Sequence, residues 1–469
     1  MQGITQEYFS ILDNYFGECF KIAKRDNFVR DSYWKKINGV YDPITINSLM
    51  DSLYEDLSKI NWSFQENSIQ NSCGLKVAYS GSVFGYSQEI SQITSFLKKT
   101  ALYADNILMN DNIYSELWSW KKKGQLGFEI SFSLICFNAI DLLCLKDFFI
   151  SDSEIPVCTL TPPMMWKFNE RHLETTIDES LYQSEVTKAN QFFGKDFSSR
   201  KELQKFLGQF DNPKDFFINS KKPFLLQGPN GKPLGAKDFF QIRQNFETKY
   251  SRSFTNTEIY ESLLRSNLSM AIYDLTYNAN LDCAFGTDYR GVWNSLNWIM
   301  KNTCILPSST KKIASKDSAV LHAIQEDEFK WLGNVPLDRI KEIRERGELR
   351  ELRDVLAENI ETVEEAEDTE FSEVSLQVRY NLTNAFKRHS AEIQDLNRLY
   401  RDKFKLSTSS IVVSGALGIS AFLYPPLAIV ATIVGGASLN SIRENFFEKR
   451  EKMKELRRKP VAMLFDAHA

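Results

Sequence analysis

The segment 406–442 constrains this chain more than any other feature, because it contains no charged residue. Pro425 and Pro426 stand at its middle. Proline lacks a backbone N–H and clashes with the preceding turn, so the pair must bend or end a helix. The segment is therefore predicted to form two apolar helices, 408–424 and 427–442. Each would be about 25 Å long, against a bilayer core of about 30 Å.

Small residues recur at every fourth position in both predicted helices. This spacing lets helix backbones approach closely, which is how helices associate where no water drives them together. We therefore predict a helical hairpin that inserts into a membrane or forms an oligomer. Besides the two prolines, its candidate residues are Ser410, Ser414 and Gly418 in the first helix and Ala428, Thr432 and Gly436 in the second.

Basic residues flank the uncharged segment on both sides. Lys403 and Lys405 precede it, and a basic tail follows it. Flanking Lys and Arg favour the cytoplasmic side of a membrane and are attracted to an anionic leaflet. The candidate basic residues of the tail are Arg443, Lys449, Arg450, Lys452, Lys454, Arg457 and Arg458, and Lys459 follows them.

The composition fits a large, ordinary globular protein. The chain has 469 residues, of which 43% are hydrophobic and 25% charged, and only 21 are Gly and 13 Pro. Scarce turn residues favour a mainly α fold over a sandwich or barrel. The net charge of −4 lacks the basic excess of a nucleic-acid-binding domain, so no nucleic-acid partner is expected.

Location is predicted from the N-terminus and the cysteines. Residues 1–16 contain early acids and no basic, apolar leader, which predicts no signal peptide. The seven cysteines form no Cys-x-x-Cys pair and several lie in apolar company, which indicates buried thiols in a reducing compartment. We therefore expect a cytoplasmic protein, associated with the inner face of the cell membrane if the hairpin inserts.

Changes in composition divide the chain into five predicted parts. Proline breaks near 163 and a polar linker at 301–316 separate the first three. The parts are an N-terminal helical domain 1–163, a middle helical domain with its linker 164–320, a charged helical region 321–405, the apolar hairpin 406–442 and the basic tail 443–469.

Several elements can be predicted from apolar spacing and capping. Residues 45–60 have a helical period, and 131–150 are apolar enough for a buried core helix or, as the alternative, a membrane segment. Thr255 and Glu258 form a capping box at a helix start. A long amphipathic helix over 374–405 is predicted from one apolar stripe. Short strands are expected near 76–86 and 222–227.

The sequence matches no known catalytic motif in full. The sequence GPNGKPLG at 228–235 lacks the first glycine and the Ser/Thr of a phosphate loop, and SGSVFG at 80–85 is no nucleophile elbow. His172, His322, His389 and His468 have no second ligand at metal spacing. Glu247-x-Lys249 matches only the tail of a nuclease motif. No catalytic, cofactor-binding or metal-binding residue is predicted.

Three stretches carry a resemblance to a known group. They are 97–111 with PVCTLTPP ending at 163, then FKWLGNVPLDRIKEIRERGELRELRDVLAENI, and the apolar segment followed by KPVAMLF. The chain resembles uncharacterised helical bacterial proteins, some of which are similar to components of anti-phage defence loci. The resemblance implies a defence context and no catalytic residue.

Three functions remain open. The hairpin predicts a membrane-acting effector, with a bilayer, a protein partner and copies of itself as partners, and the resemblance implies that it belongs to an antiviral defence system. The first alternative is a soluble scaffold or sensor subunit in which the hairpin is buried. The second is an enzyme, such as a nuclease, whose site is assembled from distant residues. The absence of a motif favours a protein that is not an enzyme.

Overall fold

The computed structural model describes most of the chain outside 408–446. The described residues are 2–39, 42–72, 74–79, 90–123, 128–150, 156–161, 170–228, 232–250, 252–265, 268, 272, 281, 283–287, 293, 298–299, 302, 317–325, 327–358, 360, 368–407, 447–456, 459–462 and 464. Helices dominate these ranges, which confirms the predicted mainly α fold.

A four-stranded parallel sheet lies at the centre of the main body. Its strands are β1 (Lys76–Tyr79), β2 (Asn106–Asn110), β3 (Cys158–Thr161) and β4 (Cys283–Gly286), in the order β3-β2-β1-β4. Nearly every strand residue is buried, as expected for parallel strands covered on both faces. β1 confirms the strand expected near 76–86. The strand expected near 222–227 is wrong, because Pro223–Leu225 form the 3₁₀ helix η1.

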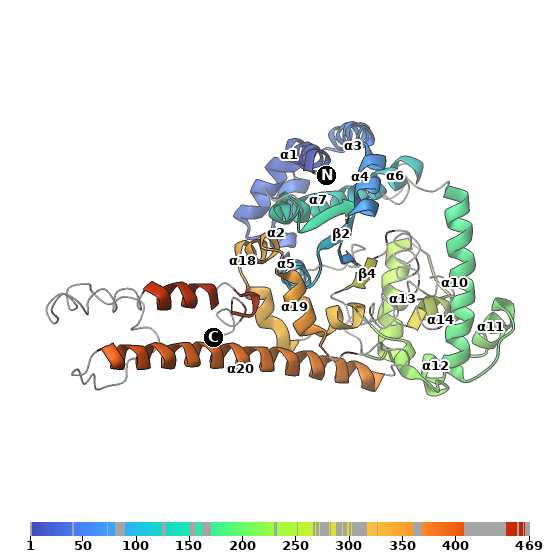
Figure 1. The fold of residues 1–469 in the computed structure, drawn as a ribbon. Coiled ribbons are helices and arrows are strands. Elements are labelled where there is room, and N and C mark those ends of the chain that lie inside the picture. The colour runs from blue at the N-terminus through green and yellow to red at the C-terminus, as the bar shows by residue number, and fades with distance from the viewer. Residues whose placement is uncertain are drawn as a thin grey trace.

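Most helices from the N-terminal part lie above the sheet in Figure 1. The helix predicted over 45–60 is confirmed as α3, and the core helix predicted over 131–150 is confirmed as α7 and α8, with Phe132, Cys136 and Ile140 buried. The helices of the N-terminal part are α1 (Gln2–Arg25), α2 (Arg30–Asn38), α3 (Pro43–Ser58), α4 (Trp62–Asn71), α5 (Ile90–Ala101), α6 (Asn112–Lys123), α7 (Phe128–Cys144) and α8 (Lys146–Phe149).

The connection from β3 to β4 contains a helical unit with its own hydrophobic core. That core is rich in phenylalanine and includes Phe192, Phe216 and Tyr260, whereas Ala284 on β4 belongs to the core of the main body. The unit consists of α10 (Glu170–Phe193), α11 (Arg200–Leu207), α12 (Pro213–Ile218), η1, α13 (Ala236–Tyr250) and α14 (Asn256–Arg265). The sheet thus takes strands from both sides of the boundary predicted at 163.

The C-terminal part packs on the amino end of the sheet. The distal half of its long helix α20 and residues 447–456 then extend away from the sheet as an arm. Arg344 donates hydrogen bonds to the carbonyls of Ala104, Asp105 and Pro156, which immediately precede β2 and β3. Arg353 forms an ion pair with Asp105 at 2.7 Å. The elements are η2 (Asp327–Asn334), α18 (Leu337–Glu345), α19 (Leu349–Leu356) and α20 (Asp368–Ser407).

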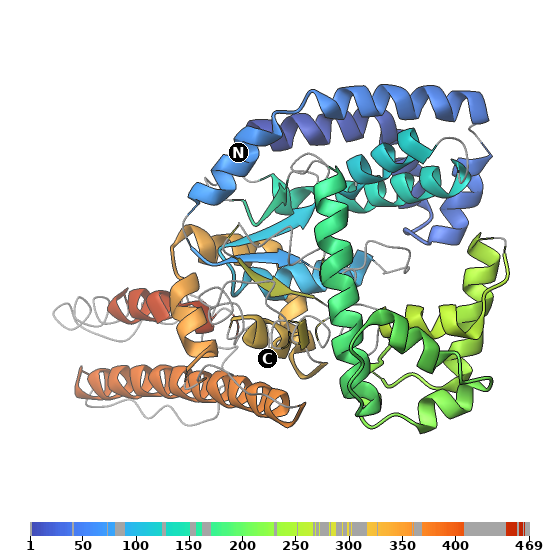
Figure 2. The ribbon, with the colours of Figure 1, turned by 90° about the vertical axis from the view of Figure 1, so that its right-hand side faces the viewer.

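The long helix α20 confirms the predicted amphipathic helix, and its apolar stripe is buried over the first half. Val378 and Leu382 are in the core, and His389 on the same stripe is buried. Beyond 389, Ile393 and Leu396 are only half-buried. Residues 447–456 form a helix alongside this distal half, as Figures 1 and 2 show.

Candidate functional site

Polar side chains gather at the carboxyl end of the parallel sheet. Asn110 ends β2, Thr161 ends β3, and Thr287 directly follows β4. Both threonines are buried, and the Thr161 hydroxyl donates a 2.8 Å hydrogen bond to the Asn110 side-chain oxygen. Because all four strands are parallel, these groups share one edge of the sheet.

Asp111 follows β2 at the same edge and organises the start of α6. Its Oδ1 accepts hydrogen bonds from the Tyr8 hydroxyl at 2.8 Å and from the backbone amides of Ile113 and Tyr114 at 2.9 and 3.1 Å. Burial raises the pKa of this carboxyl to about 6. These contacts make Asp111 the N-terminal cap of α6, so its first role is to fix that helix to the edge of the sheet.

The chain connections after β1 and before β4 run to opposite sides of β1 in the sheet. From β1 the chain proceeds outward to β2 and β3, and it returns on the other side to place β4 against β1. In open α/β sheets, ligands bind outside the carboxyl ends of the strands at such a switch point. Gly286 permits close packing here, since an added Cβ would lie 3.0 Å from Val77 Cγ1 and 3.1 Å from Phe96 Cζ.

The helix α10 lies to the right of the sheet in Figure 1, and Figure 2 views the molecule from that side. Ser184, Lys188 and Gln191 are spaced at four and three residues, so they form one polar stripe along α10. Ser184 and Lys188 are buried.

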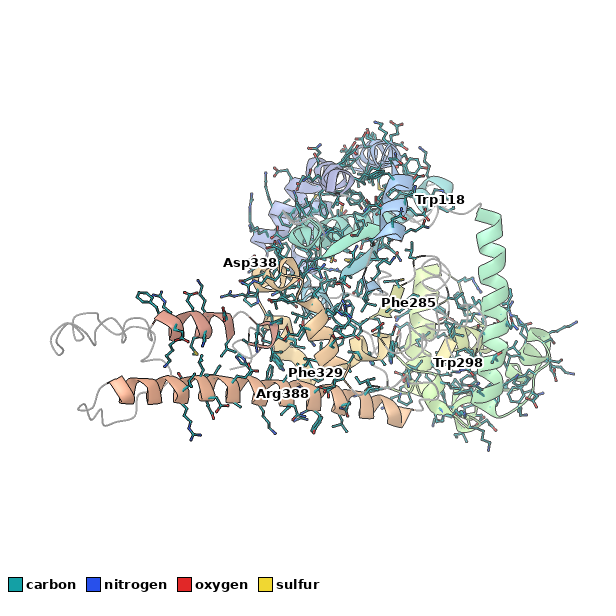
Figure 3. All side chains as sticks on the ribbon, in the orientation of Figure 1. Trp118, Phe285, Trp298, Phe329, Asp338 and Arg388 are labelled. Atoms are coloured by element: carbon teal, nitrogen blue, oxygen red, sulfur yellow. The ribbon has the colours of Figure 1, made fainter. Side chains whose placement is uncertain are left out.

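The chain that follows β4 packs against this stripe. The Trp298 indole N–H donates to Gln191 Oε1 at 2.9 Å, and the Gln191 amide donates to Asn302 Oδ1 at 2.7 Å. Figure 3 shows Phe285 on β4 and Trp298 beside the helical unit. The polar stripe of α10 is therefore turned away from the phenylalanine core and toward the segment that leaves the sheet at Thr287.

Lys188, on the polar stripe of α10, has a strongly lowered pKa. Its side chain is buried, and desolvation lowers its pKa to about 7. Two other buried lysines hold backbone carbonyls: Lys76 donates to Ile69 O at 3.3 Å and Lys99 to Gln325 O at 3.2 Å.

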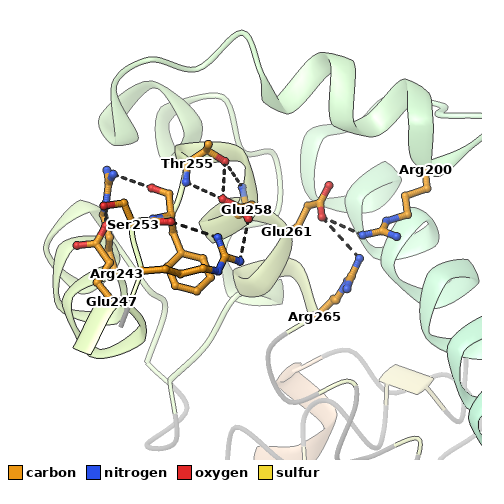
Figure 4. A network of polar contacts seen from close by, with 10 residues as sticks. Arg200, Arg243, Glu247, Ser253, Thr255, Glu258, Glu261 and Arg265 are labelled. Atoms are coloured by element: carbon orange, nitrogen blue, oxygen red, sulfur yellow. Dashed lines mark hydrogen bonds and ion pairs between the residues drawn. The ribbon is translucent and has the colours of Figure 1, made fainter. Parts of the chain in front are cut away.

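Paired charges join α10 to its neighbouring helices, and Figure 4 shows Arg200, Glu261 and Arg265 among them. Glu185 is buried on α10, and its Oε2 lies 2.9 Å from Arg265 and 3.7 Å from Arg200. Glu261 contacts the same two arginines at 3.7 and 3.0 Å. Both guanidinium groups also lie over the Tyr182 ring, at 5.2 and 4.4 Å from its centroid. This network joins α10, α11 and α14 and fixes the orientation of α10.

The helical unit also contains two features that the sequence analysis singled out. The capping box is confirmed: the Thr255 amide donates to Glu258 at 2.7 Å, and the Glu258 amide donates to Thr255 Oγ1 at 3.2 Å. Glu247, the acid of the partial nuclease match, accepts from Arg243 and from the Phe254 amide. These bonds give it a structural role.

The candidate hairpin lies outside the described residues. This applies to Ser410, Ser414, Gly418, Pro425, Pro426, Ala428, Thr432 and Gly436, and to Arg443, Arg457 and Arg458 of the basic tail. Lys449, Arg450, Lys452 and Lys454 are on the helical residues 447–456, where Lys452 pairs with Glu448 at 2.8 Å. Farther along the tail, Lys459 pairs with Glu392 of α20 at 2.8 Å. None of the described helices combines the length and apolar character needed to cross a bilayer.

The histidines stay apart in the described ranges. His322 is buried and stacks on Trp293 with ring centroids 4.9 Å apart, while His389 lies on α20. Within these ranges, no cluster of three or more His, Cys, Asp or Glu side chains has the arrangement of a metal site. The side chain of His172 and all of His468 lie outside the described residues.

Comparison with known proteins yields no relative. No family model, no curated protein and no solved structure matches the chain. The resemblance to defence-associated proteins therefore remains a prediction, and any function must be argued from the residues themselves.

Proposed function

We propose that this chain binds a small phosphate-bearing ligand of the nucleotide class at the carboxyl end of its parallel sheet, on the side covered by α10. The observation that carries the proposal is the strand order β3-β2-β1-β4 with all strands parallel. This order creates a switch point between β1 and β4, and nucleotides bind at such points in unrelated α/β proteins.

The sequence that joins β1 to α5 supports a phosphate group as the ligand's anchor. Residues 80–89 read SGSVFGYSQE, with two glycines and three serines directly after the central strand. Glycine allows backbone amides to approach a phosphate, and the helix N-terminus that follows favours negative charge. The sequence lacks the lysine of a phosphate loop, so we propose binding without assigning a reaction.

The test is a binding survey with matched threonine variants. Purified protein is titrated with ATP, GTP, NAD and the corresponding nucleosides, and binding is followed by calorimetry and by the melting temperature. Thr287→Val removes a hydroxyl at the carboxyl end of β4. Thr159→Val is the control, because Thr159 is equally buried but bonds to Asn106 near the amino end of β2.

We expect at least one nucleotide to bind and to raise the melting temperature, while its nucleoside binds more weakly. Thr287→Val should weaken binding, and Thr159→Val should leave it unchanged. If no nucleotide binds the wild-type protein, or if the two variants affect binding equally, the ligand site does not lie at this end of the sheet.

A second function, attachment to a membrane through 406–442, is favoured by the geometry of the arm. The Lys459–Glu392 ion pair brings the tail back to α20. Beyond Glu392, α20 continues for about 22 Å to Ser407. Residues 447–456 run alongside this part (Figure 1), so both described ends of the uncharged segment belong to one arm.

Flotation with anionic liposomes tests this second proposal. Wild-type protein should float and release trapped dye, whereas Gly418→Glu with Gly436→Glu should not float. Ala391→Glu, on the exposed face of α20, adds a similar charge outside the segment and should behave as wild type. Loss of folding rather than flotation in the double variant would favour the soluble scaffold with a buried hairpin.

A further inference from the structure

Basic residues concentrate on the exposed side of α12 and α13, although the chain as a whole has a net charge of −4. The stretch 212–245 contains six basic residues and two acidic ones. Lys214 and Lys237 are exposed on these two helices, and Lys221 and Lys222 are exposed directly after α12. Within the described part of the chain, none of these four lysines forms an ion pair. Their charges are therefore available to a partner.

Two large apolar side chains are exposed on the same helices. Ile218 ends α12 and is 77% exposed, and Phe240 on α13 is 59% exposed. The inner sides of the two helices meet at the Tyr260 ring, whose centroid lies 4.4 Å from that of Phe216 and 5.1 Å from that of Phe239. The helices thus lie side by side and present basic and apolar groups together. This surface, the α12–α13 face, consists of Lys214, Ile218, Lys221, Lys222, Lys237 and Phe240.

The rest of this stretch leaves the positive excess in place. Asp238 accepts a 2.8 Å hydrogen bond from the Gly235 amide at the start of α13, and Asp215 is its exposed acid. In the sequence GPNGKPLG, which fails as a phosphate loop, the Gly228 amide donates to the Lys232 carbonyl at 3.0 Å. Lys232 is exposed, so this segment brings a further lysine close to the start of α13.

Exposed lysines beside an exposed aromatic ring are typical of surfaces that bind single strands. Proteins hold such strands with Lys and Arg along the phosphates and with aromatic side chains on which the bases stack. We propose that the α12–α13 face binds single-stranded nucleic acid, with its lysines on the phosphates and Phe240 against a base. An acidic peptide would attract the lysines but gives the exposed ring no counterpart. The net charge of the whole chain, on which the expectation of no nucleic-acid partner rests, averages out this local excess.

The experiment measures binding of a fluorescein-labelled oligothymidylate of about 20 nucleotides to the full chain, by fluorescence anisotropy at several KCl concentrations. The logarithm of the affinity should fall with the logarithm of the salt concentration, with a slope of about −0.7 for each phosphate contact. Lys221→Ala with Lys222→Ala should make this slope shallower by about 1.4. Phe240→Ala should weaken binding about fivefold to 150-fold and leave the slope unchanged, because it removes stacking and no charge.

Matched controls come from the main body. Lys35→Ala with Lys36→Ala removes two adjacent exposed lysines from α2, and Phe64→Ala removes a ring that is 54% exposed on α4. Both should bind the oligonucleotide as wild type does. The proposal is overturned if wild type does not bind, or if test and control variants lose affinity equally. Displacement of the oligonucleotide by polyglutamate at equal charge concentration would also overturn it, in favour of an acidic protein partner.

Discussion

Replacement of Lys188 by methionine should stabilise the protein, and the gain should shrink as the pH rises. Burial lowers the pKa of Lys188 from 10.5 to about 7 in the folded state. Between these values the unfolded chain binds more protons than the folded chain, so wild-type stability rises with pH across this window. Below pH 7 the cost of burying the charged lysine is fully present.

The size of the effect follows from the two pKa values. The full difference corresponds to about 5 kcal/mol, at about 1.4 kcal/mol for each pH unit. At pH 7 the cost is about 4 kcal/mol, and at pH 9 it has fallen to about 2 kcal/mol. Methionine has no charge to desolvate and adapts to irregular space. The stability advantage of the variant should thus decrease by about 2 kcal/mol between pH 7 and pH 9.

Urea denaturation of both proteins at pH 7, 8 and 9, followed by far-UV circular dichroism, measures this difference directly. Titration of the other groups is common to both proteins and cancels in the subtraction. Lys99→Met serves as a second comparison, and it should lose stability because the Gln325 carbonyl loses its donor. A difference between wild type and Lys188→Met that stays constant from pH 7 to pH 9 would refute the argument.

Further substitutions at four sites test the packing of the fold by the same urea method. Arg30→Ala leaves the half-buried Asp141 without its 2.6 Å partner and should cost about 1–3 kcal/mol, most of which Asp141→Asn in the same chain should restore. Thr255→Ala removes the capping hydroxyl and should cost about 1 kcal/mol. Gly286→Ala should cost about 1–3 kcal/mol, because the added Cβ would crowd β1 and α5. Gly17→Ala is the control: its Cβ would meet nothing within 4 Å, so it should stabilise α1 by about 0.5–1 kcal/mol. Equal effects at the two glycines would contradict this packing.

The helices could be predicted from the sequence because their apolar positions are periodic and their ends are marked. The segment 131–150 illustrates this point. Its apolar residues predict a core helix, and Asp141, which interrupts them, is accommodated by the ion pair with Arg30. The capping box at Thr255 was equally visible, since both of its partners lie within one turn.

Three of the four strands could not be predicted in the same way. The strands β2, β3 and β4 have only four or five residues, and nearly all of them are buried. Short apolar runs without alternation are indistinguishable from pieces of a helix until their pairing is known. The helix α5, for example, ends at Ala101, and β2 begins only a few residues later at Asn106.

The candidate site was invisible for a related reason. Thr161, Lys188 and Thr287 are separated by long stretches of chain and belong to no common motif. Thr161 and Thr287 lie at one end of the sheet only because the strands are parallel, and Lys188 is on a helical unit inserted between β3 and β4. The local signal was the Gly/Ser-rich sequence after β1. Because it matches no known catalytic motif, it indicated neither a reaction nor the order of the strands around it.

The sheet separates the proposed ligand site from the base of the arm. Thr287 lies at the carboxyl end of the sheet, whereas Arg344 holds the carbonyls of Ala104, Asp105 and Pro156, which precede β2 and β3 at the amino end. Arg353 adds its ion pair with Asp105 at that same end. If a ligand controls the arm, the strands β2 and β3 connect the two regions directly, because they contribute residues to both ends. Coupling between nucleotide binding and membrane attachment should therefore depend on the anchoring arginines, even though they touch neither partner.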